Sequence, residues 1–497
     1  MSRVEDATDP LLAPWRRIPV GALGAPAVAD LPAPVSLRRM MGPGIVLAGL
    51  ALGSGELVLW PYIVSTSGFV FFWACLLGVT SQYFLNLEIE RWSLLTGESA
   101  VTGMARLGRG VAGVLLFLHV VPWLIPAWAR GAAELLSWIF WPEGGGISPT
   151  WLAVGGLFAC GIVLSAGKFI YDTVERVQMV LVTLITMLVV GIALVLLRPD
   201  AVVALAKGSV SIGRLPEMGH GLDAALLLGA IAFAGAGGSL NLGQSSYVMD
   251  KGYGMGNRAG RLTSPLRGDE TETVATSWVF PLTPENLARW RVWWKRASLE
   301  HLLTFFAACV ICLVVLALIA YCVFFEPDGT RAVAVEGAGH DLSFLRTEAG
   351  IIKERMGGAL SLAFLVAGVA ILLTTELGVL DAASRISTDL VGSLCPRRSA
   401  VFTRSRLYFA FLWGTILLSC VLLVLGTEKL GALSLFRYTA AMNGGVMFLY
   451  TGLLLYLNRC RLPREVRTST WRAVILLVSI AFYGFFAVWA VVSVVGG

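Results

Sequence analysis

The stretch that decides the fold is residues 43–66, Pro-Gly-Ile-Val-Leu-Ala-Gly-Leu-Ala-Leu-Gly-Ser-Gly-Glu-Leu-Val-Leu-Trp-Pro-Tyr-Ile-Val-Ser-Thr. It is long enough to cross a bilayer as a helix, which takes about 20 apolar residues. Its centre, however, is Gly53-Ser54-Gly55-Glu56, which combines two helix-breaking glycines with a carboxylate. A charged side chain at mid-membrane costs on the order of 3 kcal/mol, and broken helices are tolerated in lipid only where they line a cavity. We therefore predict a discontinuous membrane helix beside a binding site.

The composition is that of a membrane protein. Of the 497 residues 57% are apolar and only 14% are charged, against roughly 25% charged in a soluble domain. The eight cysteines are scattered singly and the four histidines lie far apart along the chain, so neither a disulfide framework nor a zinc motif is indicated. Because no nucleotide-binding or hydrolase motif stands at a helix start or strand end, we expect no enzyme and no cofactor.

Eleven apolar runs are long enough to be membrane spans. They cover residues 43–66, 68–90, 110–130, 150–168, 175–197, 222–250, 300–325, 358–381, 407–426, 433–457 and 472–494. With a cytoplasmic N-terminus, 28 of the 38 Lys and Arg residues fall on the inner side, as the positive-inside rule requires. The net charge of +6 therefore reflects topology in the plasma (inner) membrane and not a nucleic-acid surface. The odd number of spans places the C-terminus outside.

A second break lies in the sixth span, where residues 234–241 read Ala-Gly-Ala-Gly-Gly-Ser-Leu-Asn. Spans one to five and six to ten then form two halves that each open with a broken helix, as in the inverted repeats of the LeuT-type architecture. We expect an all-α polytopic membrane protein of this kind. Its predicted parts are a disordered cytoplasmic tail at 1–40, a first repeat at 41–200, a second repeat at 201–460 that includes a cytoplasmic loop at 251–298, and an additional helix at 461–497.

Two further features outside the breaks carry predictions. Thr283-Pro284-Glu285 is typical of a helix start, with proline at the first helical position. The tryptophans that follow it, at 290, 293 and 294, favour an aromatic belt before span seven over an interfacial helix. Asn443 is a lone polar residue in span ten, and we expect it to hydrogen-bond to a neighbouring helix.

The first break offers Gly53, Ser54 and Glu56 as candidate binding residues. A carboxylate that faces a central cavity can bind a cation, a proton or both. The other interpretation is structural, because Glu56 stands at the N-terminal end of the second half-helix, where it can accept hydrogen bonds from exposed backbone N–H groups. The two interpretations are compatible.

The second break offers Gly237, Gly238, Ser239 and Asn241, with Gln244 one turn further on. Small residues let the backbone approach a ligand closely. Free carbonyls and the Asn241 amide are suitable cation ligands, while the half-helix that follows presents N–H groups to an anion. Packing of small residues between helices is the alternative interpretation.

Three charged residues in or just after the eighth span form another candidate group. Asp381 and Arg385 are spaced four residues apart and are predicted to pair on one helix face, as a structural ion pair or an inner gate. Glu376 lies deeper in the span and is the better candidate for a proton path.

The chain resembles the natural-resistance-associated macrophage protein family, the Nramp transporters. The motifs that carry this resemblance are Gly42-Pro43-Gly44 opening span one, Gln82 in span two, Leu95-Thr96-Gly97 after it, Glu175-Arg176-Val177 after Tyr171, and Asn241 at the second break. They cover about residues 40 to 250, and the layout of spans and breaks extends the likeness to about residue 460. The resemblance implies a LeuT-type fold with alternating access and transport of manganese or iron.

The family's metal site is not intact in this sequence. Its first broken helix normally reads Asp-Pro-Gly-Asn, which corresponds to residues 53–56, and its Met-Pro-His-Asn pattern corresponds to residues 238–241. Glycines therefore replace the metal-binding Asp and Met, which removes the soft sulfur ligand that prefers late transition metals. We also expect these glycines to open space at the site.

Three functions follow from these observations. The first is proton-coupled symport of a divalent metal cation held by Glu56 and Asn241, with carbonyls near Gly53 and Gly237. The second is transport of a small organic solute whose carboxylate meets the half-helix N-termini. The third is a membrane sensor that has kept the fold and lost transport. The expected partners are accordingly the transported ion or solute and the lipid bilayer, without nucleic acid.

Overall fold

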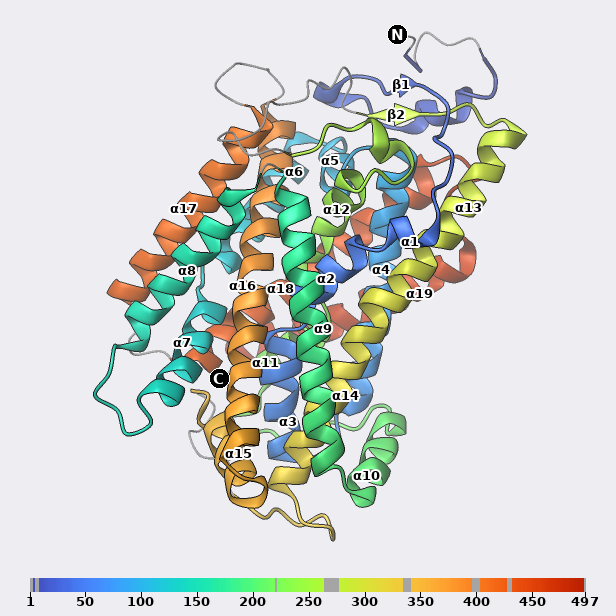
Figure 1. Ribbon diagram of the computed structural model, residues 1–497. Helices are drawn as coiled ribbons and strands as arrows, with labels where there is room; N and C mark the ends of the chain where they lie inside the picture. The colour runs from blue at the N-terminus through green and yellow to red at the C-terminus, as the bar shows by residue number, and fades with distance from the viewer. Residues whose placement is uncertain are drawn as a thin grey trace.

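The structure of the chain is a computed structural model that describes residues 3–4, 9–167, 169–219, 221–262, 277–333, 341–395, 403–426 and 431–495. Long helices run roughly side by side in one bundle (Figure 1). The helices are α1 (Leu37–Met40), α2 (Pro43–Ala51), α3 (Trp60–Ser67), α4 (Phe72–Thr96), α5 (Ala100–Ala105), α6 (Arg109–Trp123), α7 (Ala127–Phe140), α8 (Pro149–Ala166), α9 (Ile170–Leu196), α10 (Pro199–Val210), α11 (Ala224–Ala232), α12 (Gln244–Asp250), α13 (Pro284–His301), α14 (Ala307–Phe324), α15 (Ser343–Met356), α16 (Gly358–Leu394), α17 (Arg404–Leu425), α18 (Ala432–Tyr456) and α19 (Thr470–Val495). Short 3-10 or π-helical turns are η1 (Ala13–Arg17), η2 (Gly21–Leu23), η3 (Gly55–Leu59), η4 (Gly238–Gly243), η5 (Gly254–Arg258), η6 (Leu302–Phe306) and η7 (Leu457–Arg461).

The protein is an all-α polytopic membrane protein. Nine helical segments of the described chain are long and apolar enough to cross a membrane, at Pro43–Ser67, Arg109–Phe140, Pro149–Ala166, Ile170–Leu196, Pro284–Phe324, Gly358–Leu394, Arg404–Leu425, Ala432–Arg461 and Thr470–Ser493. They match nine of the eleven predicted spans. The helix α4 and the broken segment formed by α11, η4 and α12 correspond to predicted spans two and six, and both lie within the bundle (Figure 1).

Both predicted breaks are present, and they face each other. The first predicted span is interrupted after α2 by a turn at Leu52 and Gly53, one residue earlier than predicted. Gly55 begins the π-helical turn η3. The sixth predicted span loses its helical geometry after α11 and becomes helical again in η4, as predicted. A Cβ atom at Gly55 would collide with the backbone carbonyl of Phe233. Only glycine lets the two broken segments approach this closely.

The expectation of a disordered tail is wrong for the described residues 9–40. Trp15 and Leu31 are fully buried, and β1 (Ala27–Val28) pairs in parallel with β2 (Trp278–Val279), with Ala27 opposite Trp278. Arg106 anchors the segment by donating hydrogen bonds to three of its backbone carbonyls at 2.9 to 3.1 Å. The proline-rich composition was misleading because the apolar partners of this segment lie more than 200 residues away in the sequence.

The loop predicted at 251–298 ends in a long helix. Thr283 caps α13 as predicted, since its hydroxyl accepts the Asn286 N–H at 3.2 Å. From Pro284 the helix continues through η6 and α14 for 41 residues. Trp293 is buried and donates its indole N–H to the Pro32 carbonyl at 2.9 Å, so this aromatic side chain contacts the N-terminal segment instead of lipid. Residues 263–276 of the predicted loop lie outside the described residues.

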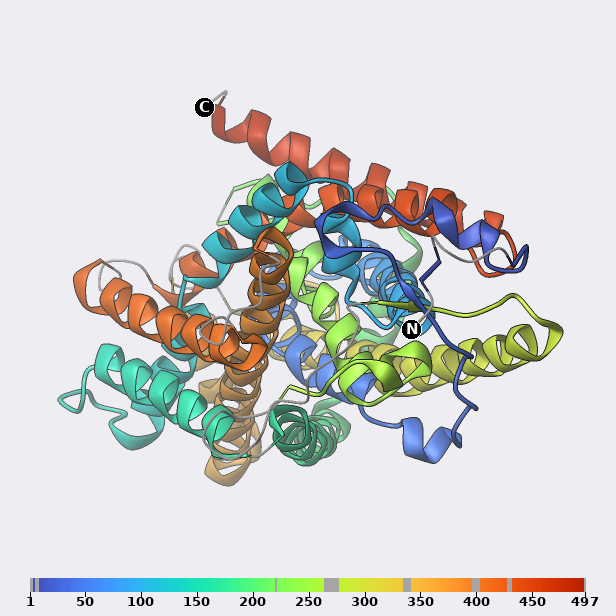
Figure 2. The same cartoon turned by 90° about the horizontal axis from the view of Figure 1, so that it is seen from above.

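The two ends of the bundle carry different elements. The N-terminal segment, β1, β2 and the start of α13 gather at one end, whereas α10 and α15 lie at the opposite end (Figure 1). Seen from above, α19 runs along the periphery of the bundle (Figure 2). This position is in keeping with an additional helix outside the two repeats.

Glu348 on α15 makes the stability of the protein depend on pH. The side chain is 1% exposed and its Oε2 lacks a hydrogen-bond partner among the described residues. Burial raises the pKa of Glu348 from 4.5 to about 8. Between these pH values the folded protein retains a proton that the unfolded chain releases. The contribution of Glu348 to stability is therefore fully present below pH 4.5 and is lost as the pH rises to about 8.

We predict that Glu348→Gln removes this loss of stability. The thermal midpoint of the variant, measured in detergent, should change less than that of the parent between pH 5 and pH 8, because the amide does not ionise. The linkage is at most about 1.4 kcal/mol per pH unit for one group. Glu354→Gln, at an exposed site on the same helix, is the matched control and should follow the parent. Equal pH profiles for parent and Glu348→Gln would contradict the assignment.

Candidate functional site

At the first break, Glu56 is both a backbone cap and a carboxylate with spare capacity. It is 1% exposed, and its Oε2 accepts the Gly53 N–H at 3.2 Å. Its Oε1 is buried with no hydrogen-bond partner among the described residues. Ser54 beside it is 3% exposed. The predicted capping interaction is thus present, and it leaves one carboxylate oxygen open to another ligand.

The glycines at the breaks do not open space, which corrects the sequence-based expectation. A Cβ at Gly53 would lie 2.5 Å from the Thr375 hydroxyl oxygen, and one at Gly238 would collide with the Asn443 amide. A Cβ at Gly237 would collide with the Phe233 ring. Neighbouring side chains therefore occupy the volume that the missing side chains would have taken, and the glycines serve close packing of helices.

At the second break, Gln82 on α4 satisfies backbone groups that the interrupted helix leaves free. Its amide donates to the Ala232 carbonyl at 2.8 Å, and its Oε1 accepts the Gly237 N–H at 3.3 Å. The same oxygen accepts from the Asn241 amide at 3.3 Å. The Asn241 amide also lies 3.3 Å from the Tyr450 hydroxyl. Asn241 Oδ1 is buried and has no partner among the described residues, so it too remains open to a ligand.

Ser239 is held by a chain of hydrogen bonds that sequence reasoning missed. His119 Nε2 lies 3.1 Å from the Ala383 carbonyl, which can only accept, so this nitrogen carries the proton. The unprotonated Nδ1 then accepts from the Ser239 hydroxyl at 2.7 Å, and that oxygen accepts the Trp123 indole N–H at 2.9 Å. The Ser239 N–H donates to Asn443 Oδ1 at 3.2 Å, which confirms the predicted interhelical bond of Asn443.

The two predicted metal-binding residues, Glu56 and Asn241, are not hydrogen-bonded to each other. Among the hydrogen bonds of the described chain, none joins Glu56 to Asn241. Three buried thiols, Cys75, Cys309 and Cys312, lie close enough to Glu56 to interact with its charge. Sequence reasoning missed them because each cysteine stands alone in an apolar run.

The predicted pair of Asp381 and Arg385 belongs to a larger buried cluster. Arg385 Nε donates to both Asp381 oxygens at 2.9 Å, and its Nη1 donates to Asp250 Oδ2 at 2.5 Å. The Tyr408 hydroxyl donates to Asp381 Oδ1 at 2.7 Å. The cluster joins α16 to the end of α12, the second half of the broken sixth helix. Glu376 stands apart from it, and its Oε2 accepts the Ala129 N–H at 3.2 Å.

Gln244 was predicted to extend the group of binding residues at the second break, but it faces a different part of the protein. Its amide donates to Glu90 Oε1 on α4 at 2.6 Å, and its own Oε1 has no partner among the described residues. It therefore belongs to a separate buried group around Glu90.

No family model matches the chain, and no curated protein matches it in sequence. Solved structures do match its fold. The manganese transporter of Eremococcus coleocola, as the mutant H236A, is 12% identical with a TM-score of 0.64 over 93% of this chain and 88% of that one. The same transporter in complex with an aromatic bis-isothiourea substituted compound is 13% identical with a TM-score of 0.64, over 94% and 89%. Mhp1, a nucleobase-cation-symport-1 family transporter in a closed conformation with bromovinylhydantoin bound, is 13% identical with a TM-score of 0.55, over 93% and 92%.

These likenesses extend over nearly the whole chain and show that it has the LeuT-type transporter fold. The identities are too low to carry substrate or family membership across.

We predict that Gly53→Ala destabilises the fold through a specific collision with Thr375. Overpacking of this kind typically costs 1–3 kcal/mol. Thr375→Ala alone loses the 3.0 Å hydrogen bond from its hydroxyl to the Leu52 carbonyl, but it removes the two atoms nearest to the added Cβ. The double variant should lose less stability than the two single variants lose together, as measured by thermal unfolding in detergent.

Gly191→Ala is the control for the glycine exchange. Gly191 lies within α9 and a Cβ there meets nothing within 4 Å, so the change should be neutral or slightly stabilising. Strictly additive effects of Gly53→Ala and Thr375→Ala would show that the two residues do not pack against each other.

Proposed function

We propose that the protein is an Nramp-like secondary-active transporter that moves a divalent metal cation in symport with protons. The observation that carries this proposal is Glu56, a buried carboxylate at the break of the first helix with one oxygen hydrogen-bonded and the other free. The LeuT-type fold supports a transport role, and the similarity to a manganese transporter favours a metal. The proposed function is transport alone and assigns no catalytic residue.

The free oxygens of Glu56 and Asn241 supply the cation ligands in this proposal. Each is the unpartnered acceptor atom of a buried side chain, and each belongs to one of the two broken helices. Carboxylate and amide oxygens suit Mg²⁺, Ca²⁺ and Mn²⁺. The ion would draw the two breaks together, with Gly53 and Gly237 contributing carbonyls as the backbone adjusts.

Proton coupling follows from the same burial. When the cation leaves, Glu56 faces an apolar environment without an ion-pair partner among the described residues. A proton then neutralises the carboxylate at less cost than leaving it charged. Glu376, which is also buried and outside those ion pairs, is the proposed next group on the proton path.

The cluster of Asp381, Arg385 and Asp250 is the proposed inner gate. It ties α12 to α16 through charged hydrogen bonds of 2.5 to 2.9 Å. Glu56 and Asn241 are at most 1% exposed, so this conformation is closed around the site. Release of an ion requires α12 or α2 to move, and a movement of α12 away from α16 would separate Arg385 from Asp250.

Transport of a small organic solute is the competing proposal. Mhp1 has bromovinylhydantoin bound, but the space that such a solute would need beside Gly53 and Gly238 is filled by Thr375 and Asn443. A small cation fits the closed site better.

We place the protein in the plasma membrane with the N-terminus in the cytoplasm and the C-terminus outside. The positive-inside bias supports this orientation. The N-terminal segment and the start of α13 lie at one end of the bundle, and α10 and α15 lie at the other (Figure 1). The proposed orientation therefore puts α10 and α15 on the outer side.

We predict that Glu56→Gln abolishes proton-coupled uptake of divalent cations while leaving the fold intact. The amide keeps the shape of the side chain and its bond to the Gly53 N–H, but it loses the charge that binds a cation or a proton. The measurement is Mn²⁺ uptake into proteoliposomes under an inward proton gradient, with accompanying acidification of the lumen. Glu143→Gln, the same exchange in an exposed loop, should transport like the parent.

Uptake by Glu56→Gln at the parental rate with an unaltered pH profile would reject the functional role and leave Glu56 as a cap alone. If the parent protein transports small organic acids or amines from a parallel panel and no divalent cation, the competing solute proposal replaces this one.

A further inference from the structure

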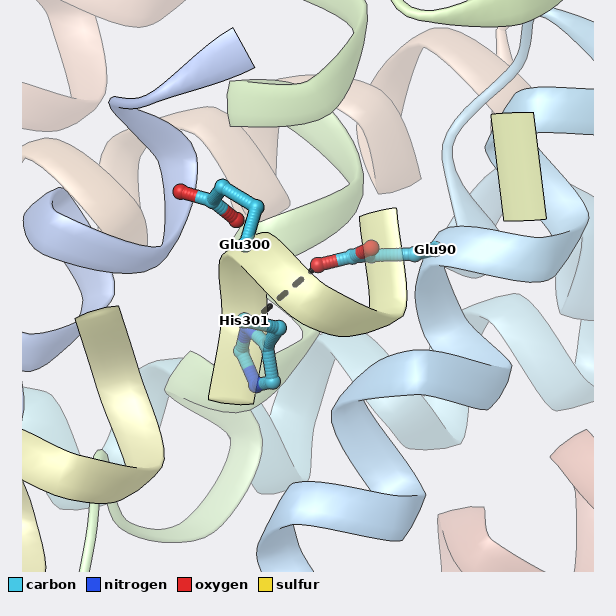
Figure 3. A group of neighbouring side chains, drawn as sticks. All are labelled: Glu90, Glu300 and His301. Carbon is cyan, nitrogen blue, oxygen red and sulfur yellow. Dashed lines mark ion pairs between the residues drawn. The ribbon is translucent and has the colours of Figure 1, made fainter. Parts of the chain in front are cut away.

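A second buried group of potential ligands lies away from Glu56. Within the described residues, the single set of three or more His, Cys, Asp or Glu side chains with ligand atoms within 4.8 Å of one another is Glu90, Glu300 and His301. All three side chains have 0% exposure. Glu90 extends from α4 toward the last turn of α13, which carries Glu300 and His301 (Figure 3).

The group has more hydrogen-bonding atoms than partners. His301 Nδ1 lies 3.3 Å from Glu90 Oε1, but neither ring nitrogen forms a hydrogen bond within the described chain. Glu90 Oε2 and Glu300 Oε2 are likewise buried and unpartnered. Gln244 adds a fourth group, because its amide N–H binds Glu90 while its carbonyl oxygen is unpartnered. Buried polar atoms without partners are rare in folded proteins and require an explanation.

The charges of the group are not balanced either. Two other buried acids of the described chain are paired with arginine, Glu88 with Arg91 at 2.7 Å and Glu98 with Arg106 at 2.9 Å. Among the ion pairs of the described residues, Glu90 pairs only with His301, and Glu300 has no ion-pair partner. Two carboxylates buried side by side need positive charge or protons.

We propose that Glu90, Glu300 and His301 form a second cation site that takes a first-row divalent transition metal ion. The donors are two carboxylates, one imidazole and the Gln244 carbonyl oxygen. An imidazole nitrogen favours Zn²⁺, Fe²⁺ or Ni²⁺ over Mg²⁺ and Ca²⁺, which prefer oxygen ligands alone. The ligand atoms of Glu90, Glu300 and His301 already lie within 4.8 Å of one another, so small side-chain rotations bring them to metal-ligand distances of about 2.1 Å.

This site is separate from the one at Glu56 and does not depend on the proposed transport function. Glu300 stands at the N-terminal end of α2, where its Oε1 accepts the Gly42 and Gly44 N–H groups at 3.3 and 3.1 Å. Glu56 lies beyond the other end of that helix. The nine residues of α2 separate the two sites by about 13 Å.

The position of the site gives it a regulatory role. A bound ion would contact Glu300, which caps the first half of the broken helix one, and Gln244, which begins the second half of the broken helix six. Both half-helices would be held against α4 and α13. Occupancy therefore favours the conformation in which α2 and α12 stay closed over the inner end of the bundle.

The test is Zn²⁺ binding to full-length Glu56→Gln protein in detergent, purified in chelator and measured by calorimetry at pH 7.5. We expect one Zn²⁺ per chain even though the central carboxylate is missing. Replacing a ligand, as Glu56→Gln/His301→Gln, should weaken binding by at least about tenfold. Glu56→Gln/His119→Gln is the matched control, because both nitrogens of His119 are already engaged, and it should bind Zn²⁺ like Glu56→Gln.

X-ray absorption of the Zn²⁺-loaded Glu56→Gln protein provides a readout that does not require a cluster variant to fold. A nitrogen and oxygen shell with the multiple scattering of an imidazole is the expected spectrum. The proposal is overturned if Glu56→Gln binds no stoichiometric Zn²⁺, which would mean that protons alone neutralise the carboxylates. It is also overturned if the bound ion lacks an imidazole ligand, or if His301→Gln leaves the affinity unchanged. Loss of Zn²⁺ binding here would not bear on Mn²⁺ uptake through the Glu56 site.

Discussion

The structure depends on the contact between two helix breaks deep in the protein. Breaking a helix frees backbone N–H and C=O groups, and in a site without water each must find a partner. Gly55 lets the first break lie directly against the Phe233 carbonyl of the second. Side chains from other helices then supply the missing hydrogen bonds. Gln82 serves the second break from α4, and Thr375 serves the first from α16. The surrounding bundle is the scaffold that holds these partners in place.

This constraint explains which features were predictable from the sequence. Nine of the eleven spans, the two breaks and the Thr283 cap rest on local patterns of apolarity, glycine and capping residues, and the structure confirms them. The prediction that replacing Asp and Met with glycine opens space was wrong, because the volume at Gly53 and Gly238 depends on Thr375 and Asn443, which are distant in sequence. The same limit hid the role of His119 and the packed N-terminal segment.

Candidate ligands were hidden for a related reason. Glu90 and His301 lie more than 200 residues apart, and neither stands in a recognisable metal-binding motif. Gln244 was correctly singled out as a polar residue next to the second break, but its amide turns to Glu90 and not toward Asn241. The direction of a side chain on a short helix after an irregular turn follows from tertiary packing, which local sequence does not encode.

Buried acids of this protein occur in two environments, and the difference separates structural from functional carboxylates. Glu88 and Asp381 share their charge with arginines that are themselves buried, and removing either partner would leave an uncompensated charge. Glu56 and Glu300 instead accept backbone N–H groups with one oxygen and keep the other free. Both lie next to α2, one at each end. A backbone amide holds such a carboxylate in position without neutralising it, so the acid remains able to take up a cation or a proton. Because the same two carboxylates hold the ends of α2, an ion bound at either one acts on the helix whose movement would open the site.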